Sequence, residues 1–247
     1  MKKITLVLVL ICLFTLGYCE ETKGINKITS ANELLLKMDE AVHIDVLKDV
    51  KSISYKMSRE IPVQKAKGIY EFMSIEDKVI QINTMNNGKE SMAFDGQNFW
   101  AFVKNREIMN FTTSWMNNLK SSSLAVMKKP KSFYASIVLG AIEKFEGKEC
   151  YLLLYKSKEH SVSDVKVYID RKTFLIAGTI RYTVDNANAQ TPADFTYKTV
   201  YHTYKKCING FLVPETMTED YEGLIIKQTL VDIKFNPEID ENIFKKH

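Results

Sequence analysis

The feature that most constrains this chain is the alternation of apolar and polar residues that continues, strand after strand, from Asp49 to the C-terminus. A period of two is typical of β-strands with one buried face. The dipeptides Asn87-Gly88 and Asp95-Gly96 lie between alternating runs and indicate hairpin turns. One interruption, at residues 112–145, has helical spacing instead. The sequence therefore predicts one large antiparallel sheet with a layer of helices against it.

A short helix is predicted before the first strand. Ser30 and Glu33 have the spacing of a capping box, in which the two side chains satisfy free amides of the first turn. The apolar residues that follow, from Leu34 to Val46, fall on one stripe of a helix. We therefore expect this helix to pack one face on an apolar surface.

The interruption is predicted to hold two helices separated at Pro130. The first has an apolar face, and the second, residues 132–145, is apolar almost all round. Part of that surface must meet either the sheet or a bound apolar molecule. The apolar residues of these helices include Trp115, Met116, Leu119, Phe133 and Ile137.

The N-terminus has the three parts of a secretory signal peptide: basic residues 1–3, an apolar run at residues 4–16, and small residues near Cys19. The apolar run is too short to cross a bilayer of about 30 Å as a helix. We expect residues 1–19 to be the signal and residues 20–247 to form a single domain.

Cleavage of the signal has two possible outcomes. Residues 16–19 resemble the lipobox in which Cys19 is acylated, whereas Tyr18 is bulkier than the residue that this motif places before its cysteine, and ordinary cleavage near Gly17 or Cys19 is the alternative.

Charge and cysteine content exclude some classes of protein. Without Lys2 and Lys3 the 34 basic residues fall to 32 against 30 acidic ones, which leaves no electrostatic footprint for nucleic acid. A content of 45% apolar residues argues against disorder. In a simple meander Cys150 and Cys207 would lie about 14 Å apart, so we expect free thiols rather than a disulfide, which needs Cα atoms within about 7 Å.

Motifs of catalysis and metal binding are absent from the sequence. It contains no G-x-S-x-G elbow, P-loop, H-E-x-x-H or C-x-x-C pattern. The histidines His43, His160 and His202 are scattered, and the acidic pairs have the spacing of solvated surface charges. We therefore expect no enzyme, no cofactor and no metal.

Four short sequence strings occur in order along the chain. They are Phe94-Asp95-Gly96 followed by Trp100, residues 147–151, residues 167–173, and a last string at residues 236–240. Together with the export signal, the early helix and the alternating strands, they resemble the LolA/LolB-like outer-membrane lipoprotein-sorting proteins. The resemblance covers about residues 30–245.

The resemblance implies a mainly β fold: a curved, unclosed antiparallel β-barrel of about eleven strands with helices plugging its concave face. It also implies that residues 20–247 form a LolA-like lipid-binding domain whose apolar cavity holds acyl chains. Carriers of this family hold their helical lid with an Arg from an early strand, and here that region offers Lys56 and Arg59 without a clear match. Burial of an acyl chain gains about 0.8 kcal/mol per CH₂. Apolar contacts alone are therefore enough for tight binding, and the function requires no catalytic group.

The expected ligand-binding residues come from the sheet wall and the helical lid. On the wall, Trp100 and Phe102 share one strand face that the architecture of the family directs toward the cavity. The alternative for each residue is a place in the core of a closed sheet-and-helix sandwich. The full expected set is Ile53, Tyr55, Met57, Trp100, Phe102, Trp115, Met116, Leu119, Phe133 and Ile137.

Three functions remain open from the sequence. The first is a periplasmic carrier or binder of lipids or lipoprotein acyl chains, and the second is an envelope sensor or interaction module of the same fold, like the sigma-factor regulators. The third, a lipid hydrolase, is disfavoured by the missing nucleophile motif. The expected partners are a lipid or acylated lipoprotein, and a membrane transporter complex or outer-membrane acceptor. The expected location is the periplasm, either free or anchored through a lipidated Cys19.

The two cleavage outcomes differ in a measurable way. If Cys19 is acylated, the mature protein partitions into detergent, and Cys19→Ser abolishes that partitioning because the acyl anchor is lost. Mass spectrometry of the mature N-terminus provides the check. An unlipidated N-terminus would rule out the anchored form.

Overall fold

The computed structural model describes most of the chain beyond the N-terminal region. The described residues are 28–86, 88–103, 106–107, 116, 119–129, 133–158, 164–185 and 193–246, with the backbone alone for residues 103, 106–107, 182–185 and 193–195. The predicted signal at residues 1–19, with Cys19, lies outside these residues. So does Trp115. Within the described part of the chain, no helix is both long enough and apolar enough to cross a membrane.

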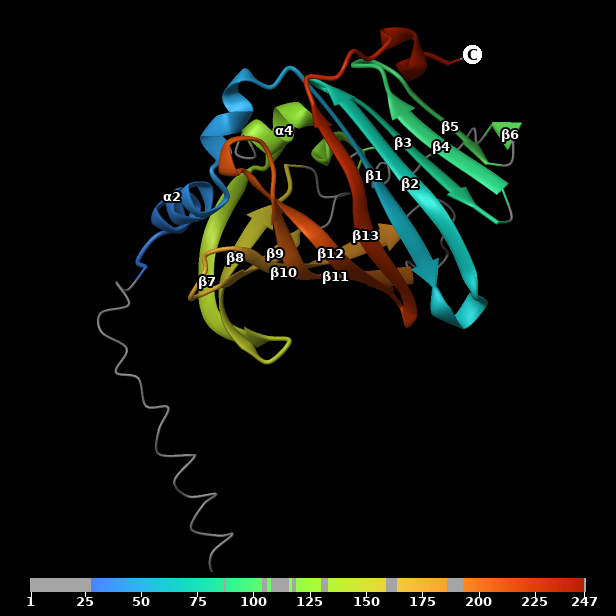
Figure 1. The fold of residues 1–247 in the computed structure, drawn as a ribbon. Coiled ribbons are helices and arrows are strands. Elements are labelled where there is room, and N and C mark those ends of the chain that lie inside the picture. Colours follow the sequence, from blue (N-terminus) through green and yellow to red (C-terminus); the bar gives the residue numbers. More distant parts are fainter. Residues whose placement is uncertain are drawn as a thin grey trace, which may run out of the picture.

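A single antiparallel sheet makes up most of the fold (Figure 1). Its 13 described strands run in the order β6-β5-β4-β3-β2-β1-β13-β12-β11-β10-β9-β8-β7. Strands β6 and β7 therefore form the two edges, and the sheet is not closed into a barrel. The strands are β1 Ser52–Ile61, β2 Ala66–Ile75, β3 Lys78–Met85, β4 Gly88–Phe94, β5 Phe99–Val103, β6 Arg106–Glu107, β7 Ser136–Phe145, β8 Lys148–Lys156, β9 Val165–Asp170, β10 Ile176–Asp185, β11 Ala193–Lys206, β12 Leu212–Tyr221 and β13 Leu224–Phe235.

Two meanders are joined by one pairing. Strands β1 to β6 follow one another across the first half of the sheet, and strands β7 to β13 across the second. The first strand and the last strand then pair, from Ile53 opposite Phe235 to Glu60 opposite Lys227. The predicted mainly β, unclosed antiparallel architecture is thus confirmed, with more strands than the expected eleven or so.

The predicted second helix at residues 132–145 is wrong, because residues 136–145 form strand β7. This strand pairs with β8 from Ser136 opposite Lys156 to Phe145 opposite Lys148. The segment carries apolar side chains on both sides of the sheet: Ile137 packs in the cluster beneath helix α2, Phe145 packs in a cluster on the opposite face, and Val138 is 45% exposed. A run that is apolar all round cannot be assigned to helix or strand from its periodicity alone.

Short helical segments accompany the sheet. Helix α2 (Ala31–Val42) begins at Ser30, whose hydroxyl accepts from the amide of Glu33, as predicted; the Glu33 carboxylate accepts from Thr29 rather than from Ser30. The 3-10 helix η1 (Ile44–Asp49) continues from α2 after His43, which has a left-handed backbone conformation. Helix α4 (Leu124–Lys128) lies in the connection between the meanders, and the remaining 3-10 helices are η2 (Pro62–Gln64), η3 (Ile208–Gly210) and η4 (Glu241–Phe244).

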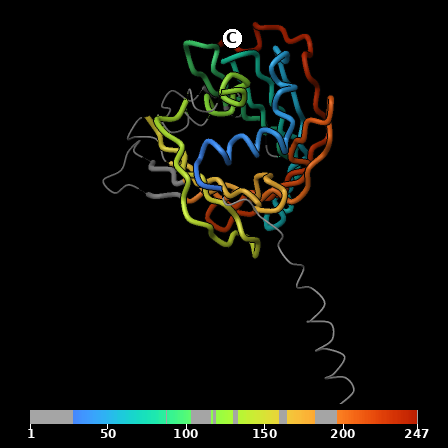
Figure 2. Tube along the Cα trace, turned by 90° about the vertical axis from the view of Figure 1, so that its left-hand side faces the viewer, coloured from blue at the N-terminus to red at the C-terminus, as the bar shows by residue number. Residues whose placement is uncertain are grey.

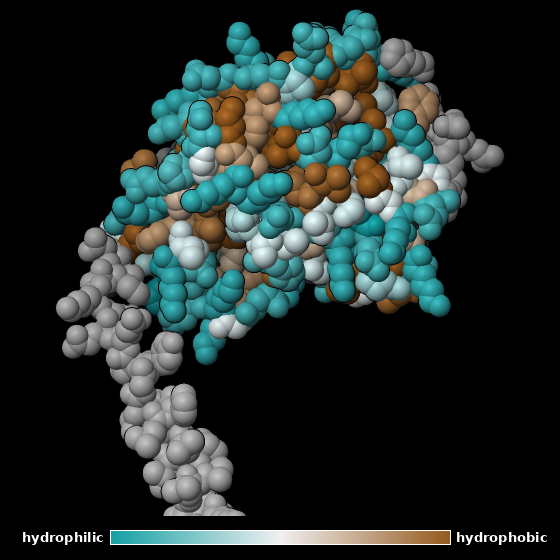
Figure 3. All heavy atoms as spheres, viewed as in Figure 1, coloured by the Kyte–Doolittle hydropathy of each residue, from teal (hydrophilic) through white to brown (hydrophobic). Residues whose placement is uncertain are grey.

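The sheet curves, and α2 lies within the curve (Figure 2). We call the face on which α2, η1 and α4 pack the concave face, and the opposite face the outer face. The outer face of β3 to β5 is covered by the C-terminal segment with η4. In the view of Figure 1 the surface is a mosaic of hydrophilic and apolar side chains (Figure 3). Cys150 and Cys207 are free thiols, as predicted, and Cys150 is buried.

Helix α2 offers a matched test of this packing. Leu34 has an exposed fraction of 0%, whereas Leu36, two residues along the same helix, is 63% exposed. We expect Leu34→Ala to lower the free energy of unfolding by about 2–5 kcal/mol, because it leaves a cavity against the sheet. Leu36→Ala should change it by no more than about 0.5 kcal/mol. Urea denaturation measures both, and equal losses would contradict the packing of α2.

Candidate binding face on the concave side of the sheet

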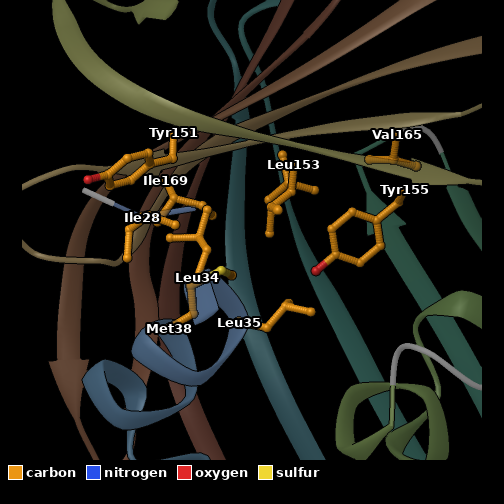
Figure 4. Packing of buried hydrophobic residues seen from close by; sticks show 10 residues of the cluster. Ile28, Leu34, Leu35, Met38, Tyr151, Leu153, Tyr155, Val165 and Ile169 are labelled. Atoms are coloured by element: carbon orange, nitrogen blue, oxygen red, sulfur yellow. The ribbon is translucent and has the colours of Figure 1, made fainter. Parts of the chain in front are cut away.

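The first part of the concave face lies beneath helix α2. Leu34, Leu35 and Met38 point from the helix toward strands β8 and β9 (Figure 4). The strand residues alternate, so that every second side chain meets the helix. The buried cluster consists of Ile28, Leu34, Leu35, Met38, Tyr151, Leu153, Tyr155, Val165, Val167 and Ile169. This half of the face is an apolar contact between helix and sheet.

The second part lies beneath η1 and the connection between the meanders. Leu47 of η1 and Leu124 of α4 are buried together with Phe72 of β2. Hydrogen bonds also hold α4 in place: the amide of Leu124 donates to Oγ of Ser74 at 2.9 Å, and the amide of Ala125 donates to the carbonyl of Glu76 at 2.9 Å. Because these bonds satisfy amides of the first turn of α4, they fix where the connection crosses the sheet.

A wall of tyrosines lines the rest of the concave face. Tyr55 stacks on Phe72 with ring centroids 4.6 Å apart, and Tyr70 lies beside Tyr55. Tyr197 and Tyr201 come from strand β11. Burial raises the pKa of all four tyrosines, yet each remains partly exposed. The four hydroxyls therefore stay protonated in the neutral pH range.

An ion pair lies among these tyrosines. Arg59 of β1 donates from Nη2 to Oε2 of Glu219 in β12 at 3.2 Å, and the two side chains are 16% and 14% exposed. The guanidinium also lies 5.7 Å from the centroid of the Tyr70 ring, within the range of a cation–π contact. Since both charges are largely removed from water, removing one partner would leave the other buried and uncompensated.

The prediction that Trp100 and Phe102 look toward the cavity is wrong. Both lie on the outer face with Phe244, and Nε1 of Trp100 donates to the carbonyl of Phe244 at 2.6 Å. The neighbouring residue Phe99 faces the concave side, where it stacks on Phe94. Strand β5 is apolar on both faces because η4 covers the outer one. The sequence therefore did not reveal which of the two sets of side chains of β5, the one with Phe99 or the one with Trp100, faces the helices.

The other expected residues fall mainly on the concave side. Ile53, Tyr55, Leu119 and Ile137 belong to its two apolar clusters. Met57 is buried and lies opposite Tyr70 in the pairing of β1 with β2. The expected residues Phe133 and Met116 are half-buried, and the ring of Phe133 lies against Tyr134.

Sequence reasoning missed the tyrosine wall and the ion pair. The sequence offered Arg59 only as a possible match to a family position, and Glu219 belongs, with Asp220, to one of the acidic pairs expected to be solvated surface charges. The available signal was the same-face spacing of Tyr55 with Arg59 and of Tyr197 with Tyr201 along their strands. Their meeting requires the pairing of β1 with β13, which local patterns do not reveal.

A recess of about 250 Å³ lies where β12 and β13 separate. Their pairing begins at Tyr221 opposite Leu224 and ends at Thr216 opposite Thr229. The recess is lined by Lys205, Lys206, Cys207, Ile208, Leu230, Val231, Asp232, Ile233 and Phe235. It mixes both charges with apolar groups, so its lining favours no one ligand chemistry.

Comparison with known proteins identifies the fold. No protein-family model and no curated protein matches the chain. Among solved structures, a LolA superfamily protein from Nitrosomonas europaea is similar with a TM-score of 0.58 at 14% identity, covering 89% of this chain and 99% of that one.

Two further structures are similar over nearly the same length. A DUF1329 family protein from Desulfovibrio piger gives a TM-score of 0.54 at 16% identity and covers 86% of this chain and 97% of that one. A putative outer membrane lipoprotein-sorting protein domain from Vibrio parahaemolyticus gives 0.53 at 12% identity, with 85% and 97% covered. The chain therefore has a LolA-like fold, as the sequence motifs predicted.

The buried tyrosines make the free energy of unfolding depend on pH in the alkaline range. A free tyrosine titrates near pH 10, and burial raises the pKa of Tyr55 in the folded state. Between these two pKa values the unfolded chain loses its proton and the folded chain keeps it, so stability falls as pH rises above about 10. We expect Tyr55→Phe to reduce this fall by up to about 1.4 kcal/mol per pH unit. Urea denaturation at a series of alkaline pH values measures it, and an unchanged slope in Tyr55→Phe would contradict the burial of this hydroxyl.

Proposed function

We propose that this protein binds acyl chains of lipids or lipoproteins on its concave face and acts as a carrier or binder in the cell envelope. One observation carries the proposal: the concave face is apolar, and it is covered by short helical segments rather than by closure of the sheet. A cover of this kind can be displaced without breaking the pairing of strands.

The free energy that packs helix α2 on the sheet and the free energy gained by burying an acyl chain are of similar size. Freeing Leu34, Leu35 and Met38 from the sheet costs about 1.5–3 kcal/mol for each side chain. An acyl chain that buries about fifteen CH₂ groups gains about 12 kcal/mol at 0.8 kcal/mol per group. One or two chains are therefore enough to offset the displacement of α2. In the ligand-free protein the helices keep the same apolar surface out of water.

The proposed setting follows from the N-terminal residues and from the fold. The sequence predicts export, and the named neighbour from Vibrio parahaemolyticus is a putative outer membrane lipoprotein-sorting domain. A location in the periplasm and exchange of acyl cargo with membrane partners fit both. On this proposal the protein works by binding rather than by catalysis.

Two neighbouring residues on strand β7 provide a test. Ile137 packs on the concave side with the cluster under α2, whereas Val138 lies on the outer side and is 45% exposed. We expect Ile137→Gln to weaken binding of a synthetic diacylated lipopeptide at least about fivefold, because an amide in an apolar site loses hydrogen bonds to water when the ligand binds. Val138→Gln should bind like the wild type. Isothermal titration calorimetry measures both.

A second measurement addresses the helical cover. If acyl chains replace the helices, hydrogen exchange in residues 31–49 should become faster when the lipopeptide binds. Failure of the wild type to bind any acylated ligand would refute the proposed function. Binding that both variants weaken equally would place the ligand elsewhere.

A further inference from the structure

Strand β13 has a neighbouring strand on both sides along only part of its length. Its pairing with β12 runs from Leu224 to Thr229 and then stops. Its pairing with β1 continues to Phe235. Among the described residues, the stretch from Leu230 to Phe235 therefore has a strand on one side only. The backbone on its other side forms an open edge within the sheet, and such an edge is a template for another extended chain.

Two local features explain why β12 and β13 separate here. Val231 is the extra residue of a β-bulge, since the register of β13 against β1 shifts at this position. A bulge bends its strand and increases the local twist. On β12, Pro214 has no amide hydrogen to donate, and proline in sheets is confined to strand edges, first residues and bulges. The open edge is thus encoded in the sequences of both strands.

The recess of about 250 Å³ adjoins this open edge. Residues 230–233 and Phe235 line it from β13, and the end of β11 lines it together with η3. Two of the lining side chains are apolar and exposed, Val231 at 58% and Ile208 at 42%. The volume is below the range of about 300–1,000 Å³ that is typical of pockets for drug-sized ligands. It suits one large side chain better than a whole small molecule.

We propose that this edge and recess form a docking site for an extended peptide segment of a partner protein. The segment adds a short strand to β13, and one of its apolar side chains fills the recess beside Ile208 and Val231. In strand addition of this kind, main-chain hydrogen bonds supply affinity and pockets for side chains supply specificity. The recess is present while the helical cover is in place, so peptide docking does not require the proposed binding of acyl chains.

The chemistry of the edge favours a peptide over an acyl chain. A strand edge presents amide donors and carbonyl acceptors, and a second extended backbone matches both. An acyl chain in the same place would cover these groups without forming hydrogen bonds, which costs free energy. The recess is also lined by Lys205, Lys206 and Asp232, whose charged groups an acyl chain would remove from water.

Binding of short peptides tests the site directly. The probe is the capped heptapeptide Ser-Val-Thr-Phe-Thr-Val-Ser, and its matched partner has glycine in place of phenylalanine. We expect the phenylalanine peptide to bind at least about fivefold more tightly, because its ring is buried in the recess. Hydrogen exchange of residues 230–235 should slow when it binds, since free amides of the edge gain acceptors. Titrations followed by NMR measure both, and a wild type that binds neither peptide would overturn the site.

Two modified probes separate strand addition from apolar contact. Both keep the side chains of the phenylalanine peptide and carry methyl groups on alternate amide nitrogens, one analogue for each alternate set. One set of amides faces β13 and the other faces away from it. We therefore expect one analogue to bind at least about tenfold more weakly, because its donors are lost, and the other to bind like the parent. Equal binding of all three peptides would show apolar contact alone and would overturn strand addition.

Val231→Asp places a charge at the recess, and it replaces a side chain that is 58% exposed. We expect this variant to lose the preference for phenylalanine over glycine. Val138→Asp is the matched control, since Val138 is 45% exposed and lies on β7, the edge strand of the second meander. This control should bind both peptides as the wild type does. Loss of binding in Val138→Asp with full binding in Val231→Asp would place the peptide at the edge of β7 and refute the site.

Ile208→Asp gives an independent variant from η3, where the side chain is 42% exposed. It should also lose the preference, so it provides the test if Val231→Asp fails to fold. A preference retained in the folded variants would exclude the recess. Light scattering tests for a second copy of the chain as the occupant. A wild-type dimer that becomes a monomer in Val231→Asp would show that a second copy fills this edge, contrary to the proposal.

Discussion

The pairing of β1 with β13 is the contact on which the rest of the structure depends. It joins the first meander to the second, from Ile53 opposite Phe235 to Glu60 opposite Lys227. Without it the molecule would be two smaller sheets, each with an additional free edge that would have to be protected. With it, Arg59 of the first strand comes within hydrogen-bonding distance of Glu219 in the second meander. This ion pair on the concave face exists only because these two halves meet.

The same pairing determines where the helices must lie. Since β1 and β13 are in the middle, β6 and β7 become opposite edges of the sheet, and the chain between them has to cross from one edge to the other. The described parts of that connection pack on the concave face, where α4 is held by Ser74 and Glu76. A helical cover over an apolar concave surface is thus a consequence of strand order. The strand pairing of the sheet does not depend on this cover.

Local sequence patterns predicted the sheet well because each strand with one covered face has its own period of two, and because capping at Ser30 depends on neighbouring residues. They failed where a strand carries apolar side chains on both faces. In β7 this made a strand resemble a helix, and in β5 it concealed that Trp100 faces η4 rather than the helices. The candidate site was only partly predictable for another reason. Tyr55 was expected, but its association with Tyr201 and Glu219 depends on pairings between strands far apart in the sequence.

The concave face combines apolar clusters with an ion pair among tyrosines, and this has a physical consequence for any bound molecule. An acyl chain alone gains the same free energy in either direction along an apolar groove, because burial of CH₂ groups is not directional. Hydrogen bonds and charges are directional, and they act strongly where the surroundings exclude water. On the proposed function, the apolar clusters under the helices are the part of the concave face that supplies affinity. The Arg59–Glu219 pair and the tyrosines beside it are its directional part.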